Sequence, residues 1–347
     1  IAKLDLRPNP EGGYYRSRGV VPMPGGGPRP LMTVIDYLLT EASPRARFHR
    51  ISADTLHFHH CGGTLRLHCV ADDGLVRSRD LGPFSRSPRT EPQVALAGGL
   101  WKGMELVSGS YALISEAVVP GWCAQDHTSA SAADLLRFLS TAKAHRTGEN
   151  ASTIRRFIDD TAKPAKPAKP ANDPVDQPID GPALIRALDL QAHVEGGFFR
   201  EVWRASGSVI TAAGRRPPAN TIYYLLTQNA PLGVFHSNVS SITHFLHSGG
   251  PIVYSMIDSE GSWHEVVLGR DRAAGQVLSF TCPGGWWKSS GLATGAEHGL
   301  ISEIVAPGFV DADRILANAE DFRRRYPELE PHWRPRVPSQ GEGERGR

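Results

Sequence analysis

Apolar and polar positions alternate in short runs along most of this chain. Leu65, Leu67 and Cys69 alternate with their neighbours, and an Asp-Asp-Gly turn follows at residues 72–74. A similar run ends at the Asp-Ser-Glu-Gly of residues 258–261. Alternation with a period of two, bounded by Asp/Gly turns, is typical of β-hairpins. Short strands of this kind, without long helices between them, predict an antiparallel sandwich or barrel.

Helical spacing of apolar residues occurs in two places. Residues 131–144 carry three leucines at helical spacing, and residues 312–326 carry Ile315, Leu316 and Phe322 in a similar pattern. Each segment follows a β-like region. We therefore expect one short helix at the C-terminal end of each half of the chain.

The chain is a tandem duplication. Five blocks recur in the same order, with offsets between 184 and 187 residues. They are Glu-Gly-Gly with two aromatics and Arg at 11–16 and 195–200, Ile-x-Tyr-Leu-Leu-Thr at 35–40 and 222–227, Phe-His at 48–49 and 235–236, Gly-Gly-x-Trp-Lys at 98–102 and 284–288, and Leu-Ile-Ser-Glu at 113–116 and 300–303. A constant order and a nearly constant offset indicate two copies of one structural unit.

Composition agrees with a two-domain globular protein. A length of 347 residues suits two domains of about 150 residues each. Hydrophobic residues make up 40% of the chain and charged residues 21%, as in ordinary globular proteins. The net charge of +2 predicts no strong electric field, so we expect neither nucleic acid nor a membrane as a partner.

The cysteines and the hydropathy of the chain indicate in which cellular compartment the protein is expected. The four cysteines show neither zinc-finger spacing nor a dense disulfide pattern, which indicates a reduced, cytoplasmic setting. No run of eighteen apolar residues occurs, and the first residues lack the basic-then-apolar pattern of a signal sequence.

A Lys-Pro repeat at residues 163–170 separates the two copies. Such a segment cannot bury a core and favours an extended polyproline conformation. We therefore predict a first domain at 1–147, a linker at 148–180, a second domain at 181–330 and a disordered tail at 331–347.

The ordered motifs resemble a known family. Glu-Gly-Gly-Tyr-Tyr-Arg, Phe-His-Arg, His-x-His before a Gly turn, Gly-x-x-Trp and Val-x-Pro-Gly-Trp follow one another, and the likeness covers residues 9–128 and 193–314. This set resembles the small single-domain cupins, largely of unassigned function and related to the jelly-roll sugar epimerases. The resemblance implies an all-β chain of two jelly-roll barrels in tandem, a bicupin packed as a pseudo-dimer, with an interior pocket in each barrel.

The chain departs from the general metal-binding cupin pattern. That pattern has His-x-His, a Glu about four residues later, and another His on a later strand. Here His57 and His59 are present, but Gly63 and Thr64 stand where the Glu would be, and Trp101 stands at the later His. A complete four-ligand site is therefore not expected.

Two histidines of the first copy point to metal chemistry. His57 and His59 are two apart on a strand, so their side chains share one face. His49 or Glu116 can complete a set of three ligands. We expect one divalent transition metal (Fe, Zn, Ni or Mn) in domain 1 and no nucleotide cofactor. The alternative is a metal-free polar pocket in which the histidines bind substrate or transfer protons.

The second copy lacks one of these histidines, because Leu246 replaces it beside His244. We therefore place the active pocket in domain 1 and assign substrate binding to His236, His244 and Glu303 in domain 2. Glu116 and Glu303 interrupt apolar runs, and a carboxylate there is costly to bury unless it is paired or ligating.

Three further residues of the first copy, Glu11, Arg16 and Tyr37, have two interpretations each. Glu11 and Arg16 either bind an anionic substrate group or form an ion pair that fastens the first strand. Trp101 is expected to line the pocket. Tyr37 either returns a proton or is a core tyrosine with a satisfied hydroxyl. His127 looks isolated and is assigned to the surface or the periphery.

Three functions remain open at this point. The first is a metal-dependent oxygenase, lyase or isomerase that acts on a small polar metabolite through His57, His59 and Glu116. The second is a metal-free epimerase or isomerase in which His57 or His59 removes a proton and Tyr37 returns one. The third is a non-catalytic small-molecule binding protein. The expected partner is a small molecule, and the expected assembly is a monomer or a homodimer.

Overall fold

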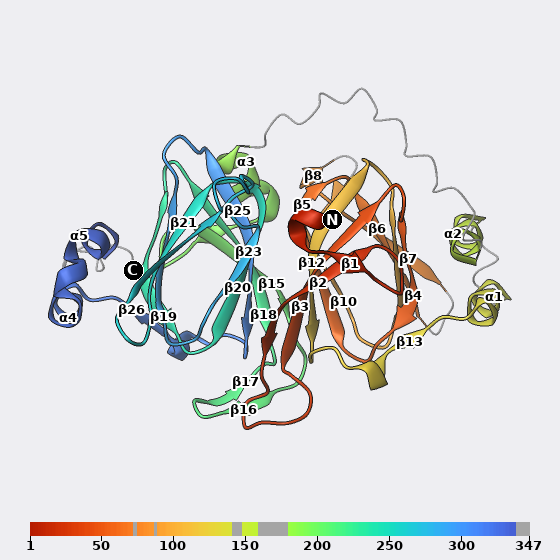
Figure 1. Cartoon of the computed structure of the whole chain (residues 1–347), viewed down its shortest axis with the longest axis horizontal. Helices are drawn as coiled ribbons and strands as arrows, with labels where there is room; N and C mark the ends of the chain where they lie inside the picture. The colour runs from red at the N-terminus through yellow and green to blue at the C-terminus, as the bar shows by residue number, and fades with distance from the viewer. Residues whose placement is uncertain (72–74, 87–88, 141–147, 159–179, 338–347) are drawn as a thin grey trace. The chain divides into compact units, whose positions relative to one another are not determined.

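Each half of the chain folds into two facing β-sheets. The computed structural model describes residues 1–71, 75–86, 89–140, 148–158 and 180–337. The chain divides into two compact units, Ile1–Val175 and Asp176–Arg347, here called domain 1 and domain 2 (Figure 1). The architecture confirms the expected fold class of two jelly-roll barrels in tandem.

Domain 1 contains a six-stranded and a five-stranded antiparallel sheet. The first has the strand order β1-β2-β3-β12-β5-β10, and the second has β13-β4-β11-β6-β7. Their bounds are β1 Arg7–Pro8, β2 Tyr14–Val21, β3 Met32–Thr40, β4 Arg45–Arg50, β5 Asp54–Gly62, β6 Leu65–Val70, β7 Val76–Leu81, β10 Gln93–Leu96, β11 Trp101–Leu106, β12 Tyr111–Val119 and β13 Thr128–Ser129. A small hairpin adds β8 Ser85–Arg86 and β9 Arg89–Thr90.

Both sheets of domain 1 contribute to one hydrophobic core. Tyr37 and Ile114 enter it from the six-stranded sheet, and Leu65, Leu67 and Met104 enter it from the five-stranded sheet. The alternation predicted for residues 65–70 is confirmed, because every second residue from Leu65 lies in this core. Side chains therefore alternate between the inside and the outside of the barrel along each strand. Polar residues at the inward positions face the barrel interior.

Domain 2 repeats this topology. Its sheets have the orders β14-β15-β18-β25-β20-β23 and β22-β21-β24-β19-β26. The bounds are β14 Gln191–Ala192, β15 Phe198–Arg204, β18 Asn220–Thr227, β19 Leu232–Asn238, β20 Ser241–Gly249, β21 Ile252–Ile257, β22 Trp263–Leu268, β23 Ser279–Cys282, β24 Trp287–Leu292, β25 His298–Ala306 and β26 Arg314–Leu316. A separate hairpin is formed by β16 Val209–Thr211 and β17 Gly214–Arg216.

The helices are short and depart from the prediction in several places. Their bounds are α1 Ala132–Ser140, α2 Gly148–Ile158, α3 Gly181–Leu188, α4 Ala319–Arg325 and α5 Glu330–Trp333, with 3-10 turns η1 Ala2–Leu4, η2 Ala124–Asp126, η4 Asp311–Asp313, η5 Pro327–Leu329 and η6 Arg334–Arg336. Within the predicted helix of residues 131–144, α1 is present, and residues 141–144 lie outside the described residues. The linker assignment was wrong for residues 148–158, because α2 buries Ile154 and Phe157 against β4 and β11.

The C-terminal helix was misplaced in the prediction. Ile315 and Leu316 lie in β26 and are 59% and 45% exposed, so they do not form a helical face. The helix α4 begins later, and Phe322 is its buried residue. The predicted tail was wrong for residues 331–337, because Trp333 is fully buried against Phe322. The Lys-Pro repeat and residues 338–347 lie outside the described residues. In the described portion, no helix is long and apolar enough to cross a membrane.

The packing of α2 yields a stability prediction. Phe157→Ala leaves a cavity beside Phe48, whose ring centroid lies 4.8 Å from that of Phe157, and should cost about 3–5 kcal/mol of unfolding free energy. Leu136→Ala, on the exposed side of α1, should change stability by no more than about 0.5 kcal/mol. Urea unfolding followed by tryptophan fluorescence measures both. Equal effects of the two substitutions would contradict the docking of α2.

Candidate functional site

Two pairs of polar side chains face the interior of domain 1 from neighbouring strands. On the six-stranded sheet, His57 of β5 lies directly opposite Glu116 of β12, with 3.5 Å between Nε2 and Oε2. On the five-stranded sheet, His49 of β4 lies opposite Lys102 of β11. The Lys102 ammonium donates a hydrogen bond to the hydroxyl of Thr55. The barrel interior therefore holds an ammonium, a carboxyl group and two imidazoles.

A glycine turn adds a second carboxyl group to this set. Glu11 precedes Gly12, whose φ is 109° and whose added Cβ would stand 2.1 Å from the Arg45 carbonyl oxygen, so a side chain does not fit there. The Tyr37 hydroxyl donates to the Gly12 carbonyl, and the Arg47 amide donates to the Glu11 carbonyl at 2.7 Å. These contacts hold the Glu11 side chain at the rim of the barrel.

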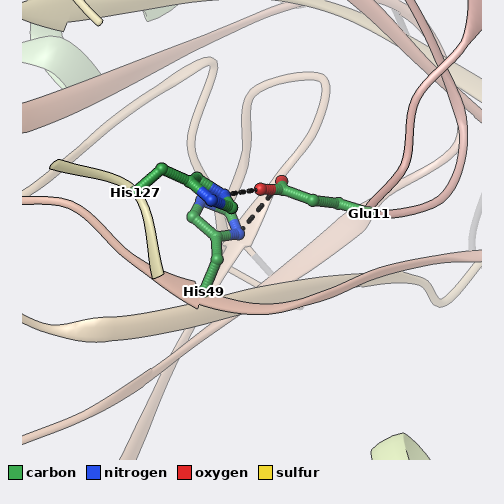
Figure 2. Close-up of side chains that lie close together, drawn as sticks. All are labelled: Glu11, His49 and His127. Carbon is green, nitrogen blue, oxygen red and sulfur yellow. Dashed lines mark hydrogen bonds and ion pairs between the residues drawn. The ribbon is translucent and has the colours of Figure 1, made fainter. Parts of the chain in front are cut away.

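Glu11 there meets two histidines. Its carboxylate lies 3.1 Å from His49 Nδ1 and is in direct contact with His127 Nε2 (Figure 2). One ligand atom of each of the three residues lies within 4.8 Å of the other two. The two imidazole rings are stacked, with centroids 5.4 Å apart. His127 comes from the segment between η2 and β13, far from the other two residues in sequence. We call these three residues the rim triad.

Burial determines the charge of the histidines. Desolvation, with a further contribution from Lys102, lowers the pKa of His49 to about 3 and that of His57 to about 3. Both rings are therefore neutral at pH 7, which is the form that ligates metals. The rim triad remains reachable by solvent, since the Glu11 and His127 side chains are 18% and 21% exposed.

The carboxyl groups shift in the opposite direction. Burial raises the pKa of Glu116 to about 7, although Lys102 opposes the shift. Burial also raises the pKa of Glu11, and the hydrogen bond from His127 opposes it. The pKa of Lys102 is lowered by burial and raised in part by Glu116. A carboxyl group that titrates near neutral pH can both donate and accept a proton.

Domain 2 carries the same frame with one substitution. Its residues are Glu195, His236, His244, Lys288 and Glu303, in the positions of Glu11, His49, His57, Lys102 and Glu116. His236 Nε2 lies 3.1 Å from Glu195, and His244 Nε2 lies 3.4 Å from Glu303. The position of His127 is occupied by Arg314, whose Nε lies 3.9 Å from Glu195.

The structure does not bring every expected ligand together. His59 is buried, but its Nε2 lies 3.1 Å from the Gly63 carbonyl oxygen and it is not part of the rim triad. The expected ligand set of His49, His57, His59 and Glu116 therefore divides. His49 lies in the rim triad, whereas His57 and Glu116 form the pair deeper in the barrel.

Two residues assigned to substrate binding lie elsewhere. Trp101 packs outside the barrel with Phe138 of α1, under the Arg50 guanidinium, because it alternates with the inward-facing Lys102. Arg16 pairs with Asp36 at 2.7 Å and not with Glu11. Trp101 therefore does not line the pocket, and the Glu11–Arg16 ion pair considered from the sequence is not formed.

Sequence reasoning missed Lys102 and His127. Lys102 follows Trp101 in a block that both copies share, so its repetition at Lys288 was an available signal. His127 gave no such signal, since its counterpart is Arg314. Only the three-dimensional fold brings His127 to Glu11, across more than a hundred residues of chain.

The family of the chain follows from comparison with known proteins. The family model described as the Cupin superfamily (DUF985) matches residues 1–130 and 182–317. The chain therefore belongs to this family and carries two copies of its unit. The uncharacterized protein YML079W of Saccharomyces cerevisiae is 35% identical over 152 residues, covering 40% of this chain and 75% of the yeast protein.

Two solved structures are also similar to this chain. A hypothetical protein from Leishmania major is 28% identical, with a TM-score of 0.44, and covers 46% of this chain and 99% of its own. Oxalate decarboxylase from Bacillus subtilis is 12% identical, with a TM-score of 0.50, and covers 95% of this chain and 81% of its own. At that identity the second match shows the bicupin fold and not the reaction.

The raised carboxyl pKa values give a testable pH dependence. Glu116 and Glu195 should be protonated below about pH 7 and ionised above it, because burial raises both pKa values to about 7. Since these values exceed those of the unfolded chain, the groups favour the folded state at low pH, and this contribution is lost as the pH rises through 7. Infrared difference spectroscopy should show carboxyl groups that titrate near pH 7.

Single substitutions identify these groups. Glu116→Gln should remove part of the infrared signal, and adding Glu195→Gln should remove the rest. Glu303→Gln is the matched control: burial would raise the pKa of Glu303, but Lys288 and His244 outweigh burial and hold it below its usual range. A neutral-pH signal that survives the double substitution would contradict the assignment.

Proposed function

We propose that domain 1 is a cupin-type metalloenzyme centre that acts on a small polar metabolite. The observation that carries this proposal is the rim triad, a carboxyl group and two imidazoles that converge at a partly solvent-reachable position. Two histidines and one carboxylate are a common ligand set for a divalent transition metal with open coordination positions.

The chemistry of the donor atoms fits such an ion. Glu11 contacts both histidines, so all three side chains can turn toward a shared cation with small movements. The His49 Nδ1 also lies 3.1 Å from the Arg47 carbonyl oxygen; an Nδ1–H bond to that oxygen would orient the ring and leave Nε2 as the nitrogen that ligates the ion. When bound, the ion would supply Lewis-acid polarisation of a carbonyl, or activation of water or oxygen.

The chain's own residues supply proton transfer and charge stabilisation. Glu116 titrates near pH 7 and lies opposite His57, so it can take a proton from a substrate carbon or return one. The Lys102 ammonium can stabilise a negative charge that develops on a substrate oxygen. Tyr37 positions the Glu11 turn, because its hydroxyl is already bound to Gly12. This division of roles supports a lyase, isomerase or oxygenase.

A metal-free isomerase or epimerase is the second candidate. The observation that favours it is the His57–Glu116 pair beside Lys102, which is complete without any ion. Here Glu116 replaces Tyr37 as the better proton carrier, since burial raises the pKa of Tyr37 well above its usual range. In either case we propose a small-molecule partner, with neither nucleic acid nor membrane involved, and a monomer or homodimer as the assembly.

Metal content of the purified protein tests the first candidate. The chain should bind roughly one divalent transition ion, and His49→Ala or His127→Ala should reduce this stoichiometry toward zero, because each removes a ligand of the triad. Elemental analysis after dialysis against Zn²⁺ or Mn²⁺ and desalting provides the measurement.

His59→Ala is the matched control for this experiment. It removes a buried imidazole that lies outside the triad, so the metal content should stay unchanged. Metal that persists in His49→Ala and His127→Ala, or that disappears in His59→Ala, would refute the triad as the centre. A protein without metal that exchanges a substrate hydrogen with solvent deuterium, and loses this activity in Glu116→Gln, would favour the second candidate.

A further inference from the structure

Arg314 occupies in domain 2 the place of His127 in domain 1. The strand β13 pairs Thr128 with Arg50 of β4, and β26 pairs Ile315 with Ser237 of β19. An offset of 187 residues relates both pairs, so the residue before each is also equivalent. A guanidinium is always charged and cannot ligate a metal. The rim of domain 2 therefore has a fixed cation where domain 1 has a potential ligand.

This cation lies 5.5 Å from the centroid of the Phe309 ring and makes no close ion pair with a carboxylate in the described residues. The guanidinium of Arg314 lies 3.9 Å from Glu195 and 3.6 Å from Asp311, which are both longer than hydrogen bonds, and the Asp311 side chain is 90% exposed. Within the described residues, these are the carboxylates recorded as ion-pair partners of Arg314. The Arg314 side chain is 18% exposed, so the guanidinium is accessible from solvent.

A second cation lies deeper in the same barrel. The Lys288 side chain is 4% exposed, and its ammonium lies 3.1 Å from His244 Nε2 and 3.8 Å from Glu303. Both Lys288 and Arg314 act on Glu195, yet burial still raises the pKa of that carboxyl group to about 7. When Glu195 is protonated, two cations face one ionised carboxylate, Glu303. The nearby His193 and His236 are neutral, because desolvation lowers their pKa values.

The interior of domain 2 also contains an unsatisfied hydroxyl group. Tyr254 is 1% exposed, and its hydroxyl has no hydrogen-bond partner in the portion of the chain that the structure describes. Its ring lies 4.6 Å from that of His244, and His244 in turn contacts Lys288 and Glu303. The equivalent residue in domain 1 is Leu67, so this polar group is specific to domain 2. A buried unpartnered hydroxyl is costly unless a ligand or water binds it.

We propose that domain 2 binds a small carboxylate, without metal, between the Arg314 guanidinium and the Lys288 ammonium. The guanidinium receives one carboxylate at the rim, where its planar donors suit bidentate binding. Protonated Glu195 and the Tyr254 hydroxyl can donate further hydrogen bonds to the ligand. The two barrels then differ in kind: the first takes a cation at its rim, and the second takes an anion.

Calorimetric titration of the full chain with malonate tests this proposal. The protein is first treated with a chelator, so the result does not depend on metal in domain 1. Malonate should bind with a stoichiometry of one, and its neutral diamide, malonamide, should bind at least tenfold more weakly. Arg314→Met should weaken malonate binding at least tenfold, because it removes the rim cation.

Two further variants make the result specific. Arg215→Met removes an exposed arginine of β17 that bonds Ser208, and it should leave malonate binding unchanged. Tyr254→Phe should weaken binding several-fold with little change in melting temperature, because the hydroxyl has no partner to lose. No malonate binding by the wild-type protein, equal binding of malonamide, or full binding by Arg314→Met would each overturn the proposal.

Discussion

Burial of charge inside a β-barrel is the constraint on which the rest of this structure depends. Each barrel places a lysine, two glutamates and two histidines beside a hydrophobic core. An isolated buried charge is expensive, so these groups must pair with one another, change protonation or bind a ligand. The short strands make the pairing possible, because Glu116 faces His57, and Lys102 faces His49, across adjacent strands. The raised pKa of Glu116 and the neutral histidines follow from the same burial.

The duplication shows which part of this frame varies. Two glutamates, two histidines and a lysine occupy equivalent positions in both barrels. The supporting contact also recurs, because the Tyr224 hydroxyl donates to the Gly196 carbonyl at 2.9 Å, as the Tyr37 hydroxyl does to the Gly12 carbonyl. The rim differs, with His127 in one barrel and Arg314 in the other. His127 contacts Glu11 in domain 1, and Arg314 lies near Glu195 in domain 2. Under the two proposals, both barrels use this frame to bind a polar ligand, and the rim residue determines the charge of that ligand.

Much of the fold was predictable from sequence, whereas the site was predictable only in part. Alternation at Leu65, Leu67 and Cys69 and the constant offset between copies gave the tandem barrels, because strand periodicity is local. The pairing of His57 with Glu116 agrees with the expectation that a repeated buried acid has a partner. His59 misled the ligand assignment, since a shared strand face does not place two side chains at one depth; its ring meets Gly63 instead. Lys102 was overlooked beside the more conspicuous Trp101, and His127 could be found only from the fold.

The central claim is that the rim of the first barrel holds a metal ion and the rim of the second does not. Anomalous diffraction from crystals of the full chain soaked in Zn²⁺ tests it most directly. The account predicts a strong anomalous peak among Glu11, His49 and His127 in domain 1, and no peak among Glu195, His236 and Arg314 in domain 2. A peak at His57 and His59, or peaks of equal height in both barrels, would contradict it.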